Sequence, residues 1–104
     1  MAVAHIQEFP IQGGDRTTGN YDAINERIRS SGTQAAGLIV HTAGFDEEAS
    51  VFRIFDVWES LEQGQAFHDG VVMPAVRSVI GEDLSGGAPP SRDSWYQLHD
   101  VQQG

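Results

Sequence analysis

Two regular elements meet in the stretch Phe52-Arg53-Ile54-Phe55-Asp56-Val57-Trp58-Glu59-Ser60-Leu61-Glu62-Gln63. Its first part, together with Val51, is rich in β-branched and aromatic residues and is apolar on both faces, with one charge on each. This pattern predicts a strand over residues 51–58 that is covered on both sides. Ser60, with Gln63 three residues later, has the spacing of a capping box and predicts the start of a helix. We therefore expect the fold to be built around a strand-to-helix junction.

The composition limits the class of protein. The chain has 104 residues and a mass of 11.3 kDa, which predicts a single domain over residues 1–104. It has no cysteine, and no apolar run approaches the roughly 20 residues that span a membrane. Its formal net charge of -9 opposes binding to nucleic acid or to an anionic membrane surface. Residues 1–5 lack the features of a signal peptide, so we expect a cytoplasmic protein.

Further elements are predicted on both sides of the junction. Apolar alternation or apolar runs predict strands over residues 3–9, 36–44 and 94–101. A helix is expected from Tyr21 to about Ser31, capped by Asn20 and ended by Gly32. The helix after Ser60 contains Gly70 and Pro74, which predict a kink and a second helix that runs to Ile80. Residues 12–20 and 84–92 have the composition of loops.

The resulting order of elements is βαββαβ. Two right-handed βαβ-like halves give a four-stranded antiparallel sheet with helices on one face, which is the ferredoxin-like fold of the α+β class. Because helices cover only one face, while residues 36–44 and 51–58 are apolar on both, we expect the open face to associate with a second copy of the chain. A homodimer is therefore predicted.

The acidic loop Asp46-Glu47-Glu48 is expected to form a solvated hairpin tip between the two central apolar strands. If Ala43 lies opposite Val51 in this hairpin, the same register places His41 beside Arg53 and Leu38 beside Asp56. A slip of one residue would move every side chain to the other face.

Three groups of residues resemble one family. They are Gly37-Leu38-Ile39-Val40-His41, then Asp56-Val57-Trp58-Glu59-Ser60-Leu61-Glu62 with Phe67, and Met73-Pro74-Ala75-Val76. In this order they resemble the antibiotic-biosynthesis monooxygenase (ABM)-like domains of the dimeric α+β barrel superfamily. The resemblance covers nearly the whole chain, although Trp-Glu-Ser at the junction is a packing motif and carries little information about chemistry.

This resemblance implies a homodimer whose two sheets form a barrel, with a small-molecule pocket between the sheet and helices of each subunit. Members of the superfamily include cofactor-free oxygenases of polycyclic aromatic polyketides, haem-degrading enzymes and isomerases. Phe67 stands at the position that resembles the catalytic Trp of the haem-degrading and quinone-forming members. Arg77 lies near the position of the haem-ligating His, and Ile6 and Gln7 replace an Asn. These departures argue against haem degradation, and the missing Trp argues against oxygenation.

His41 and Arg53 are the candidate catalytic residues. A His in an otherwise apolar strand is either a hydrogen-bonded core residue or a general base that removes a proton from a phenol or enol. Arg53 could hold the resulting oxyanion or a substrate carboxylate, or it could form a salt bridge with an Asp or Glu.

The candidate ligand-binding residues are drawn from the junction, the following helix and the last strand. Asp56 must be paired or protonated if it is buried, and its partner could be Trp58, a backbone amide or the second subunit. His68 would either line the pocket or be exposed on its helix. Trp95 and Tyr96 could pack in the core or stack on an aromatic ligand. The expected ligand-binding set is Asp56, Trp58, Phe67, His68 and Tyr96.

No metal site or cofactor is expected, because the four His residues lie on different elements and no dinucleotide or phosphate motif occurs. The function predicted first is a small cofactor-independent enzyme of the ABM-like class. It would oxygenate or rearrange an aromatic or enolisable small molecule, such as a polyketide. The alternative is a non-catalytic homodimer, either structural or binding a small apolar molecule.

Overall fold

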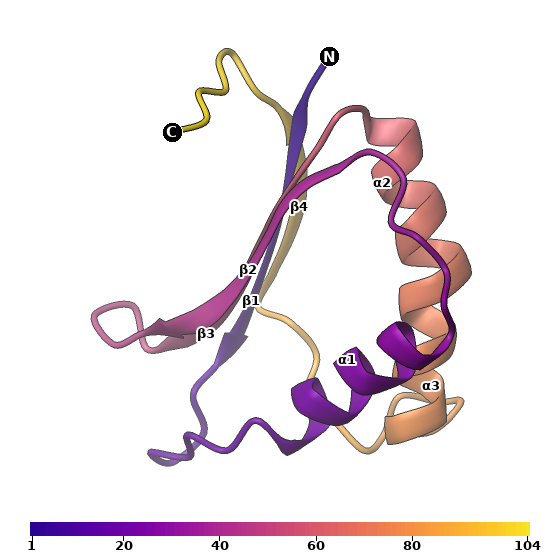
Figure 1. Ribbon diagram of the computed structural model, residues 1–104. Helices are drawn as coiled ribbons and strands as arrows, with labels where there is room; N and C mark the ends of the chain where they lie inside the picture. Colours follow the sequence, from indigo (N-terminus) through magenta and orange to yellow (C-terminus); the bar gives the residue numbers. More distant parts are fainter.

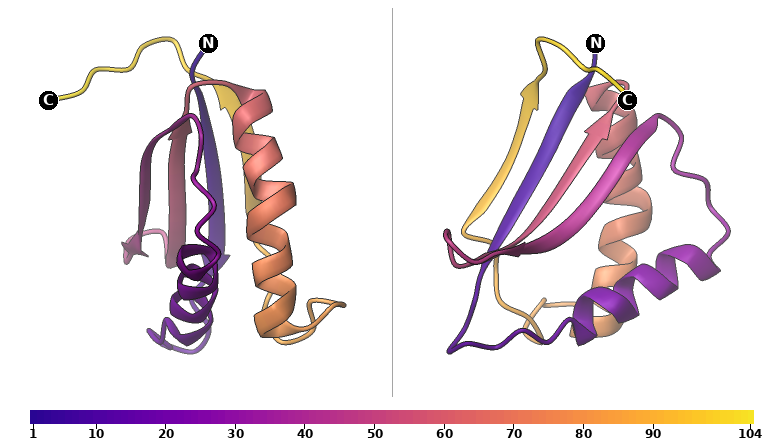
Figure 2. Two further views of the ribbon diagram at one scale, coloured as in Figure 1. Left: turned by 45° about the vertical axis from the view of Figure 1, so that its right-hand side comes forward. Right: turned by 60° about the vertical axis from the view of Figure 1, so that its left-hand side comes forward.

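The computed structural model describes residues 1–104 and contains the expected order of strands and helices (Figure 1). Four strands form one sheet, and the helices all lie on the same side of it (Figure 2). The elements are β1 (Val3–Pro10), α1 (Gly19–Ser30), β2 (Leu38–Asp46), β3 (Val51–Trp58), α2 (Leu61–Phe67), the π-helical segment η1 (His68–Val72), α3 (Met73–Ile80) and β4 (Arg92–Gln97).

The sheet has the strand order β2-β3-β1-β4, and every neighbouring pair is antiparallel. This arrangement confirms the predicted ferredoxin-like α+β fold. β1 and β3, each followed along the chain by a helical region, lie at the centre of the sheet. β2 and β4 form its edges. β4 is shorter at its C-terminal end than the predicted strand over residues 94–101 and begins two residues earlier.

The register of the β2–β3 hairpin differs from the predicted one. His41 lies opposite Asp56, Ala43 opposite Ile54 and Gly44 opposite Arg53. The shift from the predicted pairing is three residues, and an odd shift reverses the face on which each side chain lies. The prediction that His41 and Arg53 share a face is therefore wrong.

The strand-to-helix junction forms as the sequence predicts. The backbone N–H of Gln63 donates to the Ser60 hydroxyl at 3.2 Å, which caps the first turn of α2. The reciprocal half of the capping box is absent, because the Gln63 side chain accepts from the Ser60 hydroxyl and not from the Ser60 backbone N–H. β3 thus passes into α2 with only Glu59 and Ser60 between them.

The predicted kink between two helices is replaced by a π-helical segment within one continuous helical rod (Figure 1). Pro74 has no N–H, and its ring would clash with a carbonyl four residues earlier in a regular α-helix. In η1 the hydrogen bonds widen instead, and the N–H of Met73 bonds to the carbonyl of His68, five residues back. The rod therefore absorbs Pro74 without ending.

α1 is the element held least firmly in the fold. It begins at Gly19, after Thr18 and not after the predicted cap Asn20, and no side chain caps its backbone. Gly32 follows with a φ of 69°, a left-handed conformation that suits Gly and ends the helix. α1 packs mainly on α3, and none of its residues is buried.

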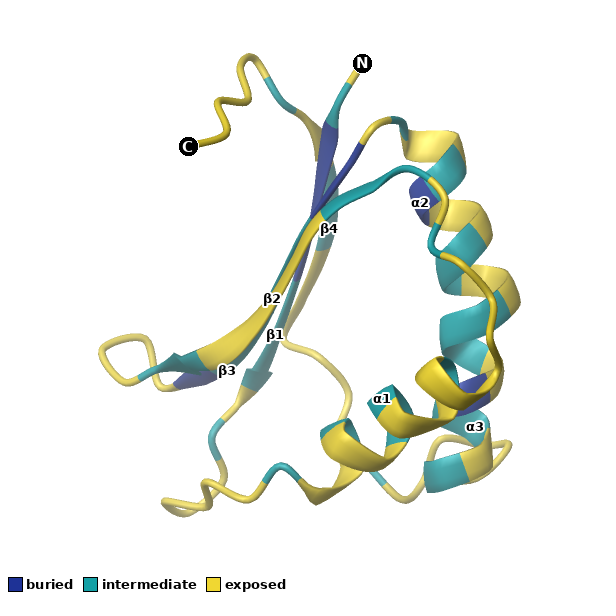
Figure 3. Cartoon of the chain, in the orientation of Figure 1, coloured by how far each residue is buried: buried dark blue, intermediate teal, exposed yellow.

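The core of the single chain is small. Nine residues are buried, and they cluster along β1, at both ends of β3, in α2 where it faces the sheet, and in α3 where it lies beside α1 (Figure 3). The accessible surface is 6577 Å², larger than the roughly 5,700 Å² expected for a compact monomer of this mass. The radius of gyration, 13.9 Å, likewise exceeds the expected value of about 13 Å. No helix combines the length and apolar character that crossing a bilayer requires.

Candidate functional site

A row of polar and aromatic side chains crosses the helix-facing side of the sheet. Directly paired residues on the four strands form it: His41 on β2, Asp56 on β3, His5 on β1 and Trp95 on β4. Neighbouring strands lie about 4.8 Å apart, so each member of the row is within reach of the next. The site is therefore a property of the sheet register, which brings together residues up to 90 positions apart.

Tyr21, His41 and Asp56 form a hydrogen-bonded chain at one end of this row. Nδ1 of His41 is hydrogen-bonded to Oδ1 of Asp56, and Nε2 of His41 lies 2.7 Å from the hydroxyl of Tyr21. A carboxylate only accepts hydrogen bonds, so Nδ1 of His41 carries a proton and donates it. In the neutral imidazole Nε2 is then an acceptor, and the Tyr21 hydroxyl donates to it. This is the arrangement of a base whose tautomer is fixed by an acid.

The charges around this chain shift two pKa values. The hydrogen bond to Asp56 raises the pKa of His41 above its ordinary value of 6.5, against an opposing effect of burial. Burial, reinforced by the negative charge of Asp56, raises the pKa of Tyr21. His41 is thereby a stronger base than a free imidazole, and Tyr21 remains a neutral phenol near pH 7.

A second cluster occupies the other end of the row. His5 is 4% exposed, its Nε2 lies 2.7 Å from Oδ1 of Asp93, and its ring stacks on Trp95 with centroids 3.8 Å apart. His68, from η1, meets the His5 ring edge-on at 5.1 Å. Burial, with a smaller contribution from His5, lowers the pKa of His68, so this imidazole is neutral near pH 7. The two ends of the row thus differ: one imidazole is made more basic and another less basic.

Aromatic side chains form the apolar wall beside this row. Trp58 is 3% exposed and packs against Phe67 of α2, with centroids 5.6 Å apart. Gly64 lies against both Trp58 and Trp95 and allows α2 to approach the sheet. The indole Nε1 of Trp58 is buried and has no hydrogen-bond partner in the protein. Such a buried, unpaired donor costs free energy.

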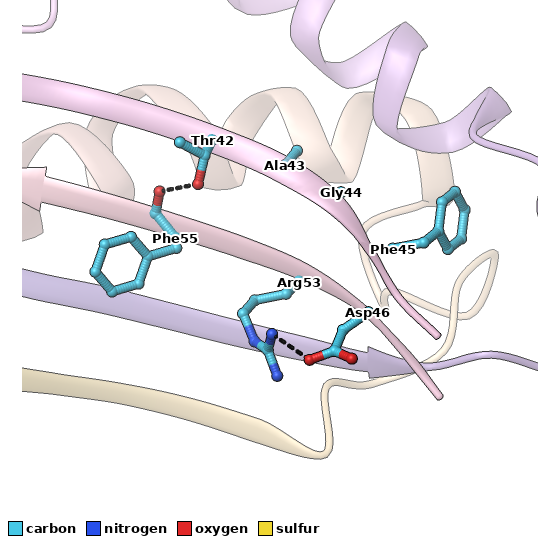
Figure 4. Close-up of a pocket in the computed structure, with 7 residues that line it drawn as sticks. All are labelled: Thr42, Ala43, Gly44, Phe45, Asp46, Arg53 and Phe55. Carbon is cyan, nitrogen blue, oxygen red and sulfur yellow. Dashed lines mark hydrogen bonds and ion pairs between the residues drawn. The ribbon is translucent and has the colours of Figure 1, made fainter. Parts of the chain in front are cut away.

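Arg53 lies on the opposite side of the sheet from His41. Its Nε donates to Glu8 at 2.7 Å, and its Nη1 donates to Asp46 at 2.7 Å. Figure 4 shows the Asp46 contact beside the shallow hollow that Thr42, Gly44 and Phe55 help to line. Of the two interpretations of Arg53 from the sequence, the salt bridge is correct, and the guanidinium cannot hold an anion formed at His41.

The predicted ligand-binding residues divide between the two faces. Asp56, Trp58, Phe67 and His68 lie on the helix-facing side with His41, so the structure brings four of the five together. Tyr96 pairs with Ala4 on the open face and is 43% exposed, so it does not line this site. The partner of Asp56 is His41, which was none of the three partners considered from the sequence.

Four residues of the site were not among the predicted site residues. Tyr21 stands at the start of the predicted helix, and its side chain reaches His41 and Phe52 of the sheet. His5 shares the alternation of Val3 and Gln7 in β1, which could have placed it beside Asp56. Trp95, for which the sequence leaves core packing and ligand stacking open, stacks on His5. Asp93 lies between the predicted loop over residues 84–92 and the predicted strand over residues 94–101, and it belongs to β4.

Two surface hollows lie outside this row. One, of about 250 Å³, is on the open face around Arg53, and the other, of about 220 Å³, lies between α1 and the η1–α3 region beside Arg27 and Pro74. No three His, Asp or Glu side chains converge in a geometry that would hold a metal ion.

Comparison with solved structures shows the same fold in other proteins. A candidate antibiotic biosynthesis monooxygenase from Bordetella bronchiseptica is 18% identical, with 93% of this chain and 96% of that chain aligned at a TM-score of 0.61. A variant of SnoaB, a cofactor-independent oxygenase from Streptomyces nogalater, is 11% identical, with 96% and 95% aligned at 0.60. NE2512 from Nitrosomonas europaea, a protein of unknown function, is 17% identical, with 99% and 94% aligned at 0.65.

No protein-family model and no curated protein matches the sequence. The structural similarity extends over nearly the whole length of these proteins, so it concerns the entire domain and not one motif. The chain therefore shares its fold with these proteins, several of which are named as antibiotic biosynthesis monooxygenases.

Proposed function

We propose that this protein is a cofactor-independent enzyme of the ABM-like class, acting on an enolisable or hydroxylated aromatic small molecule with His41 as the base. The observation that carries the proposal is the Tyr21–His41–Asp56 chain, in which Asp56 fixes the tautomer of His41 and raises its pKa. The fold shared with SnoaB, a cofactor-independent oxygenase, supports the reaction class.

The proposed reaction begins with proton transfer. Nε2 of His41 takes a proton from an enol hydroxyl, or from the carbon beside a carbonyl, and leaves a delocalised anion. The anion transfers an electron to O₂, the co-substrate, and the two radicals combine at carbon as a peroxide anion, which takes the proton back from His41. Loss of water from the hydroperoxide then leaves a new carbonyl. The balance is one CH₂ group and one O₂ giving one C=O and one H₂O.

The surroundings of His41 suit an apolar aromatic substrate. Phe52 lies on the same face of β3, two residues from Ile54 and four from Asp56, and contacts the ring of Tyr21. Trp58, Phe67 and Trp95 extend the aromatic wall toward His68. A flat, partly oxygenated molecule would find aromatic stacking partners along this wall.

A homodimer forms part of the proposal. On the open face Ile6 is flanked by Phe55 and Ser94, and Ala4 by Val57 and Tyr96. These neighbours already bury Ala4, Ile6 and Val57 within one chain. A second copy would therefore cover chiefly Val40 and Tyr96, each 43% exposed, together with the half-buried Phe55. The large surface of the single chain supports such an association.

The test is oxygen consumption with 1,8-dihydroxyanthrone as the probe, which is enolisable and whose quinone product absorbs visible light. The wild type should accelerate product formation above the uncatalysed rate, and His41→Ala should lose at least about 100-fold of that acceleration. His99→Ala is the matched control, because His99 is exposed and lies outside the sheet. Circular dichroism must show that His41→Ala remains folded. An equally active, folded His41→Ala would contradict the proposal.

A second candidate function, a non-catalytic binding or structural dimer, is favoured by one observation. Neither of the two hollows described above includes His41, and Phe67 packs on Trp58 where the resemblance would place a catalytic Trp. Under this alternative the anthrone would not be consumed, whether or not it binds. The oxygen measurement therefore separates the two functions.

A further inference from the structure

The site around His41 already contains a phenol, which is the side chain of Tyr21. Its hydroxyl is 2.7 Å from Nε2 of His41, its ring is nearly parallel to the imidazole at 6.2 Å, and its edge meets Phe52 at 5.4 Å. These contacts supply an acceptor for the hydroxyl and apolar surface for the ring. They are the contacts that any phenolic ligand would need at the same place.

The imidazole of His41 has no free nitrogen while Tyr21 is in place. Nδ1 is bonded to Asp56 and the single lone pair of Nε2 receives the Tyr21 hydroxyl. No external hydroxyl can reach the base unless the Tyr21 hydroxyl leaves. The geometry therefore sets Tyr21 and an incoming ligand in competition for one acceptor.

The structure permits Tyr21 to leave. It sits in the first turn of α1, which has no side-chain cap and no buried residue and which packs mainly on α3. The segment before it, residues 11–18, contains Gly13 and Gly14 with positive φ, and its Arg16 forms an exposed ion pair with Glu47 of the β2–β3 turn. His41 itself lies on an edge strand, with its side chain 36% exposed. The apolar contact of Tyr21 with the sheet is its edge-on packing against Phe52.

We propose that Tyr21 is an internal competitor that makes the His41 site selective for aryl hydroxyl compounds: the ligand is a phenol whose hydroxyl replaces that of Tyr21 on Nε2 of His41. This inference rests on the site described under the proposed function and adds the ligand class and the specificity-determining residue. It concerns binding only, so it does not depend on whether the bound phenol is oxidised.

The experiment is a binding titration of the full chain with 2-naphthol and with its O-methyl ether, followed by ligand fluorescence and by NMR of the His41 ring nitrogens. Tyr21→Phe keeps the ring against Phe52 but removes the competing hydroxyl. It should bind 2-naphthol about two- to tenfold more tightly than the wild type, the range of one net hydrogen bond. The methyl ether, which has no proton to donate, should bind both proteins equally.

Tyr96→Phe is the matched control, because Tyr96 lies on the open face and makes no hydrogen bond to His41. It should leave both affinities unchanged. His41→Ala should abolish the difference between 2-naphthol and its ether. In the wild type, bound 2-naphthol should shift the Tyr21 ring signals to those of an exposed tyrosine.

Several results would overturn the inference. Weaker binding of 2-naphthol to Tyr21→Phe would show that Tyr21 assists the ligand, and equal gains for naphthol and ether would show that only space was created. Absence of 2-naphthol binding to both proteins at millimolar concentration would exclude the ligand class. Turnover that requires His41 but is unchanged in Tyr21→Phe, together with unchanged naphthol affinity, would retain the proposed function and reject this inference.

Discussion

Gly64 offers a sharp test of how the aromatic wall is positioned. A Cβ at this residue would lie 2.7 Å from Cζ3 of Trp95, 2.9 Å from Cγ of Trp58 and 3.0 Å from its Cδ1. Carbon atoms in contact are normally about 3.5–4.0 Å apart, so Gly64→Ala would force a displacement approaching 1 Å. Trp58 is 3% exposed and Trp95 is stacked on His5, so neither indole can move freely.

The expected change in stability is the difference of two effects. Overpacking costs about 1–3 kcal/mol, and rigid ring atoms on both sides favour the upper part of this range. Replacing Gly by Ala in a helix contributes about 1 kcal/mol in the opposite direction. Gly64→Ala should therefore reduce the free energy of unfolding by about 1–2 kcal/mol, which lowers Tm by roughly 5–10 °C.

Gly70 provides the control within the same helical rod. A Cβ there meets no atom within 4 Å, so Gly70→Ala gains the helix propensity without a clash and should raise the free energy of unfolding by about 0.5–1 kcal/mol. Urea titrations at one protein concentration would measure both variants. If Gly64→Ala proved as stable as Gly70→Ala, the close packing of α2 on the two indoles would be refuted.

Two further predictions concern the site and the open face. The hydrogen bond to Asp56 raises the pKa of His41, so the imidazole becomes neutral only above pH 6.5. Turnover should therefore rise with pH through that raised pKa, and Asp56→Asn should shift the rise to lower pH. The same raised pKa contributes to the free energy of unfolding in full below a pH of about 6.5, and this contribution is lost as the pH rises through the pKa of His41 in the folded protein. An NMR titration of His41 that is unchanged in Asp56→Asn would contradict the predictions for both turnover and stability. Sedimentation of the wild type at micromolar concentration should give a mass of about twice 11.3 kDa. Tyr96→Glu would place a charge in the proposed interface and should give the mass of the monomer. A monomeric wild type would contradict the dimer.

The elements of the fold were predictable because each has a local cause. The run from Val51 to Trp58 is apolar on both faces, Ser60 can cap α2, and Gly32 can adopt the positive φ that ends α1. These signals act over a few residues and survive in any tertiary context. The π-helical segment was not predictable from them, because Pro74 is equally compatible with a kink, a break or a wider turn.

The residues of the site were harder to predict, because they meet only through strand pairing. His5, His41, Asp56 and Trp95 form one row on four strands, and no two of them are neighbours in the sequence. Tyr21 reaches the row from a helix, so its role depends on how α1 is placed over the sheet. Short-range patterns predict which face a residue occupies within its own element and leave its partners on other elements open.

Electrostatics could have chosen the correct register of the hairpin. Alternation within β3 places Asp56 and Arg53 on opposite faces, so His41 can face only one of them. His41 opposite Asp56 is an attractive pair in either protonation state, whereas His41 beside Arg53 becomes a repulsive pair when the imidazole is protonated. The same argument assigns Arg53 to the face that carries Glu8 and Asp46, the two carboxylates that bind it. Both charged residues of β3 are thus paired: Asp56 with His41 of β2, and Arg53 with Glu8 of β1 and Asp46 of β2. This pairing places His41, and not Arg53, on the side of the sheet that faces the helices.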